Sequence, residues 1–84
     1  MSAVAAERRT YLVLGFATTH QALDAERVLL ECGVTAKLIP APIELGGALC
    51  GIALRVPAEK SEEAENCLSR ASLPAEATVR MEDY

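Results

Sequence analysis

The chain has 84 residues, a formal net charge of −4 and 51% hydrophobic residues, with only three aromatic side chains. This length fits one small domain of modest stability. Its eight Lys and Arg residues are scattered, which argues against the basic patch of a nucleic-acid-binding surface. No apolar run reaches the roughly 18 residues of a membrane-spanning helix. We therefore expect neither nucleic acid nor a membrane as a partner.

The first half of the chain predicts a strand, a helix and a second strand. Residues 1–9 are expected to form a flexible tail, and residues 10–84 are expected to form a single domain. The β-prone apolar run from Thr10 to Ala17 predicts a buried strand. Thr18 is a side-chain N-cap for the helix that follows, and Gly33 is expected to end this helix in a left-handed conformation.

The second half predicts two more strands around a second helix. Strands are expected at 34–40, 50–56 and 76–82, with a helix opening at Pro57 and ending before Pro74. The resulting order is βαββαβ. This order is typical of an α+β, ferredoxin-like fold, in which a four-stranded antiparallel sheet carries both helices on one face.

Three cysteines and one histidine limit the chemistry of the chain. There is no C-x-x-C pair, so we expect neither a disulfide framework nor a zinc site, and we predict no metal and no cofactor. Cys32 and Cys67 lie on the apolar stripes of the two helices and are expected to be buried packing groups. The apolar segment at the N-terminus is too short for a signal peptide. We therefore expect a cytoplasmic location, where thiols stay reduced.

Cys50 is the cysteine expected to react. It ends a loop that contains Gly46 and Gly47, it is followed by Gly51, and a strand begins directly after it. A thiol at such a junction can be exposed, as thiol chemistry requires. Its alternation with Ile52 predicts a side chain directed toward the helical layer.

The predicted fold also gives Cys50 neighbours. The loops after the first and second strands lie at the same end of the sheet, which brings Cys50 near Thr18, Thr19 and His20. The N–H groups and partial positive charge of a helix N-terminus favour a thiolate, and a charged His20 would add to this effect. The alternatives are a Cys50 buried as a small hydrophobic residue and a His20 that is a solvated surface group.

These residues resemble a known family. The resemblance rests on Phe16 at the end of the first strand, Thr18–His20, Ala22–Glu26, Leu38–Pro42 and the Cys-Gly pair that opens Cys50–Val56. The pattern is similar to that of a small bacterial domain, the putative selenium/sulfur carrier protein-like family. The resemblance implies that Cys50 carries sulfur or selenium as a persulfide or perselenide, between a donor protein and an acceptor protein.

The loop before Cys50 departs from that pattern. Ile43 follows Pro42 where an arginine is usual, and Gly46, Gly47 and Ala48 stand where the family has serines. Without the serine hydroxyls and the arginine, this loop has fewer hydrogen-bond donors and one cation less than the family pattern, which implies weaker anion binding.

Two functions of different classes follow from the sequence. The first is a carrier or trafficking module that uses the Cys50 thiol. The second is a non-catalytic regulatory module that binds a small metabolite or another protein, because small βαββαβ domains serve many functions. An independent enzyme ranks third, since acid–base residues are few. A weak homodimer through the open sheet face, including Thr35, Lys37, Ile39, Ala53 and Arg55, is also predicted.

Overall fold

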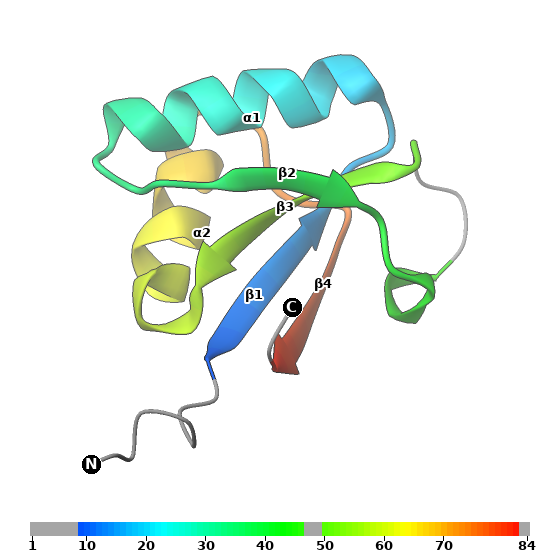
Figure 1. The fold of residues 1–84 in the computed structure, drawn as a ribbon. Coiled ribbons are helices and arrows are strands. Elements are labelled where there is room, and N and C mark those ends of the chain that lie inside the picture. The colour runs from blue at the N-terminus through cyan, green and yellow to red at the C-terminus, as the bar shows by residue number, and fades with distance from the viewer. Residues whose placement is uncertain (1–8, 47–49, 83–84) are drawn as a thin grey trace, which may run out of the picture.

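The computed structural model describes residues 9–46 and 50–82, so most of the predicted tail and Gly47 lie outside the described residues. Four strands form one sheet in the order β2-β3-β1-β4, and each neighbouring pair is antiparallel. Both helices cover the same face (Figure 1). The predicted α+β, ferredoxin-like fold is confirmed. Its elements are β1 (Thr10–Gly15), α1 (Thr19–Glu31), β2 (Lys37–Pro40), the 3₁₀ turn η2 (Ile43–Leu45), β3 (Ile52–Pro57), the 3₁₀ turn η3 (Ala58–Lys60), α2 (Ser61–Arg70) and β4 (Ala77–Glu82).

The main core lies between the sheet and the helices. Alternate residues of β1 and β3 point into it, as the period of a strand requires. They meet the small and aliphatic residues on the inner stripes of α1 and α2. The buried members of this helix-side core are Leu12, Leu14, Phe16, Ala22, Ala25, Leu29, Val34, Leu54, Val56, Ala64, Cys67 and Leu68.

A second, smaller cluster lies on the opposite sheet face. Val13 and Ala53 are fully buried there, and Leu45 of η2 packs over them. On the same face the Arg55 guanidinium stacks over the Tyr11 ring, 4.2 Å from its centroid. The face that the sequence left open is therefore partly covered by the chain itself.

The two helices end in the same hydrogen-bonded motif. After α1, the Val34 amide bonds to the Leu29 carbonyl at 2.9 Å and the Gly33 amide to the Leu30 carbonyl at 3.0 Å. This Schellman motif needs a left-handed residue, and Gly33 supplies it with φ +84°. Val34 is held in this motif and not in the sheet, and β2 begins at Lys37, later than the predicted Val34.

At the end of α2 the left-handed position is occupied by a serine. The Leu73 amide bonds to the Leu68 carbonyl at 2.8 Å and the Ser72 amide to the Ser69 carbonyl at 3.1 Å. Ser72 has φ +59° and is the one non-glycine with positive φ among the described residues. A side chain is unfavourable in this conformation, so the motif here is formed at some cost.

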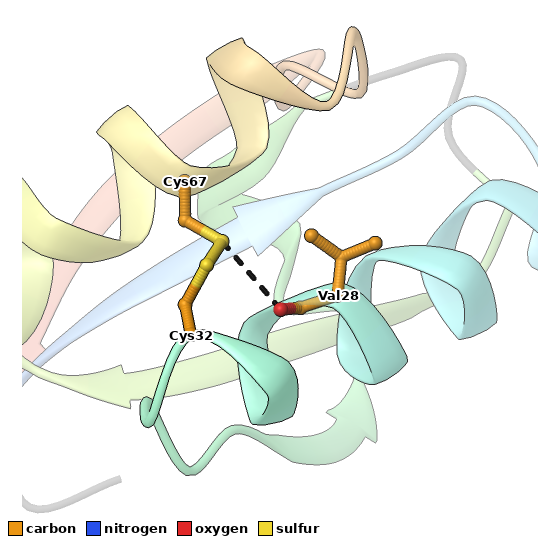
Figure 2. The surroundings of a disulfide bond; sticks show 3 residues. All are labelled: Val28, Cys32 and Cys67. Carbon is orange, nitrogen blue, oxygen red and sulfur yellow. Dashed lines mark hydrogen bonds between the residues drawn. A yellow bond between two sulfur atoms is a disulfide. The ribbon is translucent and has the colours of Figure 1, made fainter.

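The prediction for Cys32 and Cys67 was wrong. The two residues form a disulfide across 35 positions of the chain, with Cα atoms 6.5 Å apart (Figure 2). Cys67 is buried at 2% exposure, as expected, but Cys32 is exposed because it is the C-cap of α1, beyond the last helical turn. The helical stripes predict which face each cysteine occupies. They do not predict that the end of α1 meets the middle of α2.

Candidate functional site

Cys50 is the free cysteine of the chain, since the other two are joined. It precedes β3, and its backbone N–H donates to the Phe16 carbonyl over 3.1 Å. The residue is half-buried and packs against the helix-side core, which confirms the predicted direction of its side chain. The thiol lies 3.5 Å from the Ile52 carbonyl, to which its S–H donates. The backbone and the side chain of Cys50 are thus both anchored.

The bond from Cys50 to Phe16 departs from the register of the sheet. In the ladder Gly15 pairs with Ala53, so the next position would place Phe16 opposite Ile52. The amide that reaches Phe16 instead belongs to Cys50, two residues earlier in the chain. Gly51 makes this possible with φ +97°, a conformation that other residues rarely adopt. The Gly51 carbonyl also accepts the Ala41 amide at 2.9 Å, which ties the Cys-Gly pair to the chain leaving β2.

The start of α1 follows directly on Phe16. The Thr18 hydroxyl accepts the Gln21 amide at 3.1 Å, which confirms Thr18 as the N-cap. Thr18, Thr19 and His20 are all exposed. The bond between Cys50 and Phe16 ties the thiol residue to the segment that leads into α1, whereas its proximity to Thr18, Thr19 and His20 stays a prediction.

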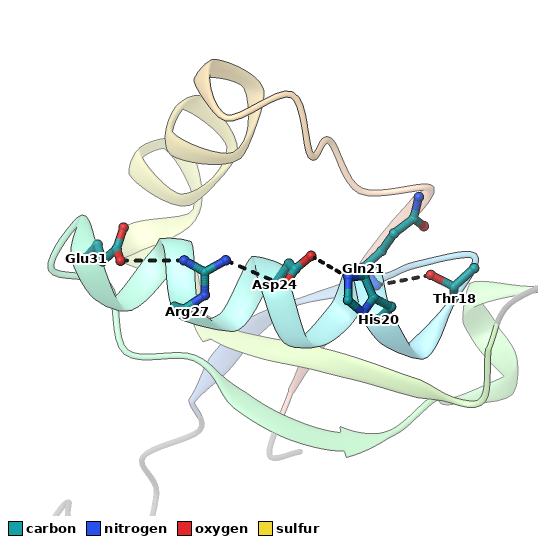
Figure 3. A network of polar contacts seen from close by, with 6 residues as sticks. All are labelled: Thr18, His20, Gln21, Asp24, Arg27 and Glu31. Atoms are coloured by element: carbon teal, nitrogen blue, oxygen red, sulfur yellow. Dashed lines mark hydrogen bonds and ion pairs between the residues drawn. The ribbon is translucent and has the colours of Figure 1, made fainter.

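His20 has a partner on its own helix. Its Nε2 lies 3.2 Å from an Asp24 carboxylate oxygen, and its side chain is 87% exposed. Asp24 also pairs with Arg27, which pairs with Glu31, so that a row of charges runs along the outer face of α1 (Figure 3). The i, i+4 spacing of His20 and Asp24 could have indicated this pair from the sequence. A role of His20 toward Cys50 stays a prediction.

The loop before Cys50 contains a structured turn that the sequence did not reveal. Leu45 of η2 is buried against the open sheet face, whereas Ile43 is 91% exposed. Gly46 ends the turn with φ +83°, and its amide bonds to the Ile43 carbonyl at 2.9 Å. Gly46 thus supplies the positive φ that ends this turn.

Within residues 9–46 and 50–82, no cluster of three or more His, Cys, Asp or Glu side chains could hold a metal ion. In the same part of the chain, no helix has the length and apolar character needed to cross a bilayer.

Comparison with known proteins identifies a family. The model of the family described as "Putative Se/S carrier protein-like" matches residues 11–80, which include both helices, the Cys-Gly pair and nearly all of the sheet. No curated protein and no solved structure gives a significant match. The match agrees with the resemblance carried by Phe16, Thr18–His20 and Cys50–Gly51. Because it covers most of the sequence, the chain belongs to the putative Se/S carrier protein-like family.

Proposed function

We propose that the protein carries a sulfur or selenium atom on the Cys50 side chain, as a persulfide or perselenide. The observation that carries this proposal is the division among the three cysteines. Two are consumed in a disulfide, and the free one stands in the Cys-Gly pair of a family named for Se/S carriage. The protein then acts as a carrier between other proteins and does not turn over a free substrate.

The proposed loading step is a simple displacement. The Cys50 thiolate attacks the terminal sulfur of a donor persulfide and forms a new S–S bond. The bond between that sulfur and the donor sulfur breaks, and its electron pair leaves with the donor as a thiolate. An acceptor nucleophile then attacks the terminal sulfur of the Cys50 persulfide, and Cys50 returns as a thiolate. Selenium follows the same sequence of bonds.

The geometry of the site supports such a step. The half-buried Cys50 is fixed through Phe16, so a partner meets a thiol in a defined place. Gly51 is exposed and presents no side chain, which leaves room for close approach. We propose that Thr18, Thr19 and His20, exposed at the neighbouring helix start, favour the charged form of the sulfur.

The proposed partners are a donor and an acceptor protein, and the proposed location is the cytoplasm, which would keep Cys50 reduced. We also propose a weak homodimer through the open sheet face. Ile39, Val79 and Met81 remain half-buried there around the cluster under Leu45. Light scattering at high protein concentration tests this association, and a monomer at all concentrations would refute it.

Loading in vitro tests the carrier function. The protein is treated with a small-molecule persulfide, separated from it, and weighed by intact mass spectrometry. The Cys32→Ser/Cys67→Ser variant, which retains only Cys50, should gain the mass of one sulfur atom. Cys50→Ser is the matched variant, in which the other two cysteines are joined, and should gain no sulfur. Equal gains in both variants would refute carriage on this residue.

The rate of Cys50 alkylation as a function of pH separates the carrier from the regulatory alternative. A carrier requires an accessible thiol that forms a thiolate readily, and a metabolite-binding module does not. If the alkylation rate of Cys50 at every pH is no higher than that of a cysteine in an unfolded peptide, the second function is favoured. The same alkylation rates measured for His20→Gln, with Asp24→Asn as the control, show whether the imidazole affects Cys50 or only its own helix.

A further inference from the structure

We propose that the Cys32–Cys67 disulfide is a second thiol site of this protein, a reversible bond that a dithiol reductant opens by attack on Cys32. The proposal is independent of sulfur carriage at Cys50. It rests on the unequal surroundings of the two sulfurs, on a hydrogen-bond acceptor placed beside one of them, and on the position of the bond in the fold.

The first observation is the difference in exposure between the two half-cystines. Cys32 is an exposed residue at the C-cap of α1, where the chain turns away from the helix (Figure 2). Cys67 is 2% exposed, inside α2 and within the helix-side core. Thiol–disulfide exchange requires an incoming thiolate to reach one sulfur, so access determines which sulfur is attacked. Cys32 is the more exposed of the two residues, so the proposed attack is at its sulfur and Cys67 is the leaving group.

The second observation concerns the fate of the leaving sulfur. The Cys67 Sγ lies 3.5 Å from the Val28 carbonyl oxygen, the contact that Figure 2 marks with a dashed line. A sulfur in a disulfide has no proton to donate, so this contact becomes an S–H···O hydrogen bond only after reduction. The reduced Cys67 thus has an acceptor already in place. Its apolar surroundings suit a free cysteine, which commonly packs as a small hydrophobic group.

The balanced reaction has two displacements. A thiolate of the reductant forms a bond to the Cys32 sulfur, the Cys32–Cys67 bond breaks, and its electron pair goes to Cys67, which takes up a proton. The second thiol of the reductant then attacks the mixed disulfide and releases Cys32. Two electrons pass to the protein, and the reductant leaves as a disulfide.

The third observation is the distance from Cys50. Cys50 is bonded to Phe16, ahead of the first turn of α1, whereas Cys32 follows its last turn. Thirteen helical residues span about 20 Å. Cys50 therefore cannot attack this disulfide within one molecule, and a separate dithiol is needed. Disulfides in cytosolic proteins, where they occur, are usually transient and either catalytic or redox-sensing.

The difference between the two sulfurs can be measured one thiol at a time. In a Cys50→Ser background, Cys67→Ser leaves Cys32 as the only thiol, and Cys32→Ser leaves Cys67. Reaction of each folded variant with 5,5′-dithiobis(2-nitrobenzoate) should be several-fold faster for Cys32. Equal rates, or a faster Cys67, would overturn the assigned direction of attack.

Reversibility is tested on Cys50→Ser alone, so that failure of sulfur carriage cannot affect the result. The oxidised protein is titrated with dithiothreitol without denaturant, and free thiols are counted by alkylation and mass. We expect reduction of the folded protein, an unchanged far-ultraviolet circular dichroism spectrum, and re-formation of the bond with oxidised glutathione. Reduction only in denaturant, loss of the fold on reduction, or failure of the bond to form would each overturn the proposal.

Discussion

The amide of Cys50 donates to the carbonyl of Phe16 over 3.1 Å, and this bond joins the free thiol to the segment that begins α1. Phe16 is itself buried in the helix-side core at 2% exposure. The position of the thiol is therefore set by the core, through Phe16, the residue that follows β1. A displaced Phe16 would displace both the N-cap at Thr18 and Cys50.

The left-handed conformation of Gly51 leads to the first prediction. Gly51→Ala should destabilise the protein by about 1–2 kcal/mol, because a Cβ is unfavourable at φ +97° even though nothing lies within 4 Å of it. It should also change the rate of Cys50 alkylation, since the bond to Phe16 depends on this turn. Urea denaturation and alkylation kinetics measure the two effects.

Gly33→Ala is the matched control for that substitution. Gly33 has φ +84°, its added Cβ also meets nothing within 4 Å, and it lies at the far end of α1. We expect a similar loss of stability with an unchanged rate at Cys50. If both variants altered the rate equally, the effect would come from general destabilisation and not from the turn.

The left-handed conformation of Ser72 predicts a substitution that increases the stability of the protein. It occupies in the second Schellman motif the position that Gly33 holds in the first, with φ +59°. Ser72→Gly should stabilise the protein by roughly 0.5–1 kcal/mol, because relief of the left-handed strain exceeds the added backbone entropy of glycine. Thermal denaturation of the two proteins at equal concentration would show a higher midpoint for the variant. A lower midpoint would contradict the strain at this position.

The disulfide predicts a larger effect on stability. Cys32→Ser/Cys67→Ser removes a cross-link between residues 35 positions apart, which the chain-entropy model values at about 3–4 kcal/mol. The variant should still fold, with a lower denaturation midpoint, since Leu29, Ala64 and Leu68 keep α1 and α2 packed. Cys50→Ser is the comparison and should lower the midpoint far less. Equal midpoints for wild type and the double variant under oxidising conditions would contradict the cross-link.

The sequence was a good guide to what depends on local pattern. Alternation predicted the sheet faces and the direction of Cys50, and capping chemistry predicted Thr18 and Gly33, because each is set by residues a few positions apart. The Cys32–Cys67 bond was missed because it depends on where two helices cross. The turn at Ile43–Leu45 was missed for a related reason, since Leu45 is fixed by the distant Val13 and Ala53.

The mass of the protein isolated from cells without reductant tests the central claim, that Cys50 carries a chalcogen atom, most directly. Peptides are mapped after blocking of free thiols, in parallel with Cys50→Ser protein from the same cells. The proposed function predicts a fraction of molecules with one additional sulfur or selenium atom on the peptide containing Cys50, and no such fraction in the variant. Cys50 recovered only as a free thiol, under conditions in which persulfides of other proteins survive, would contradict it.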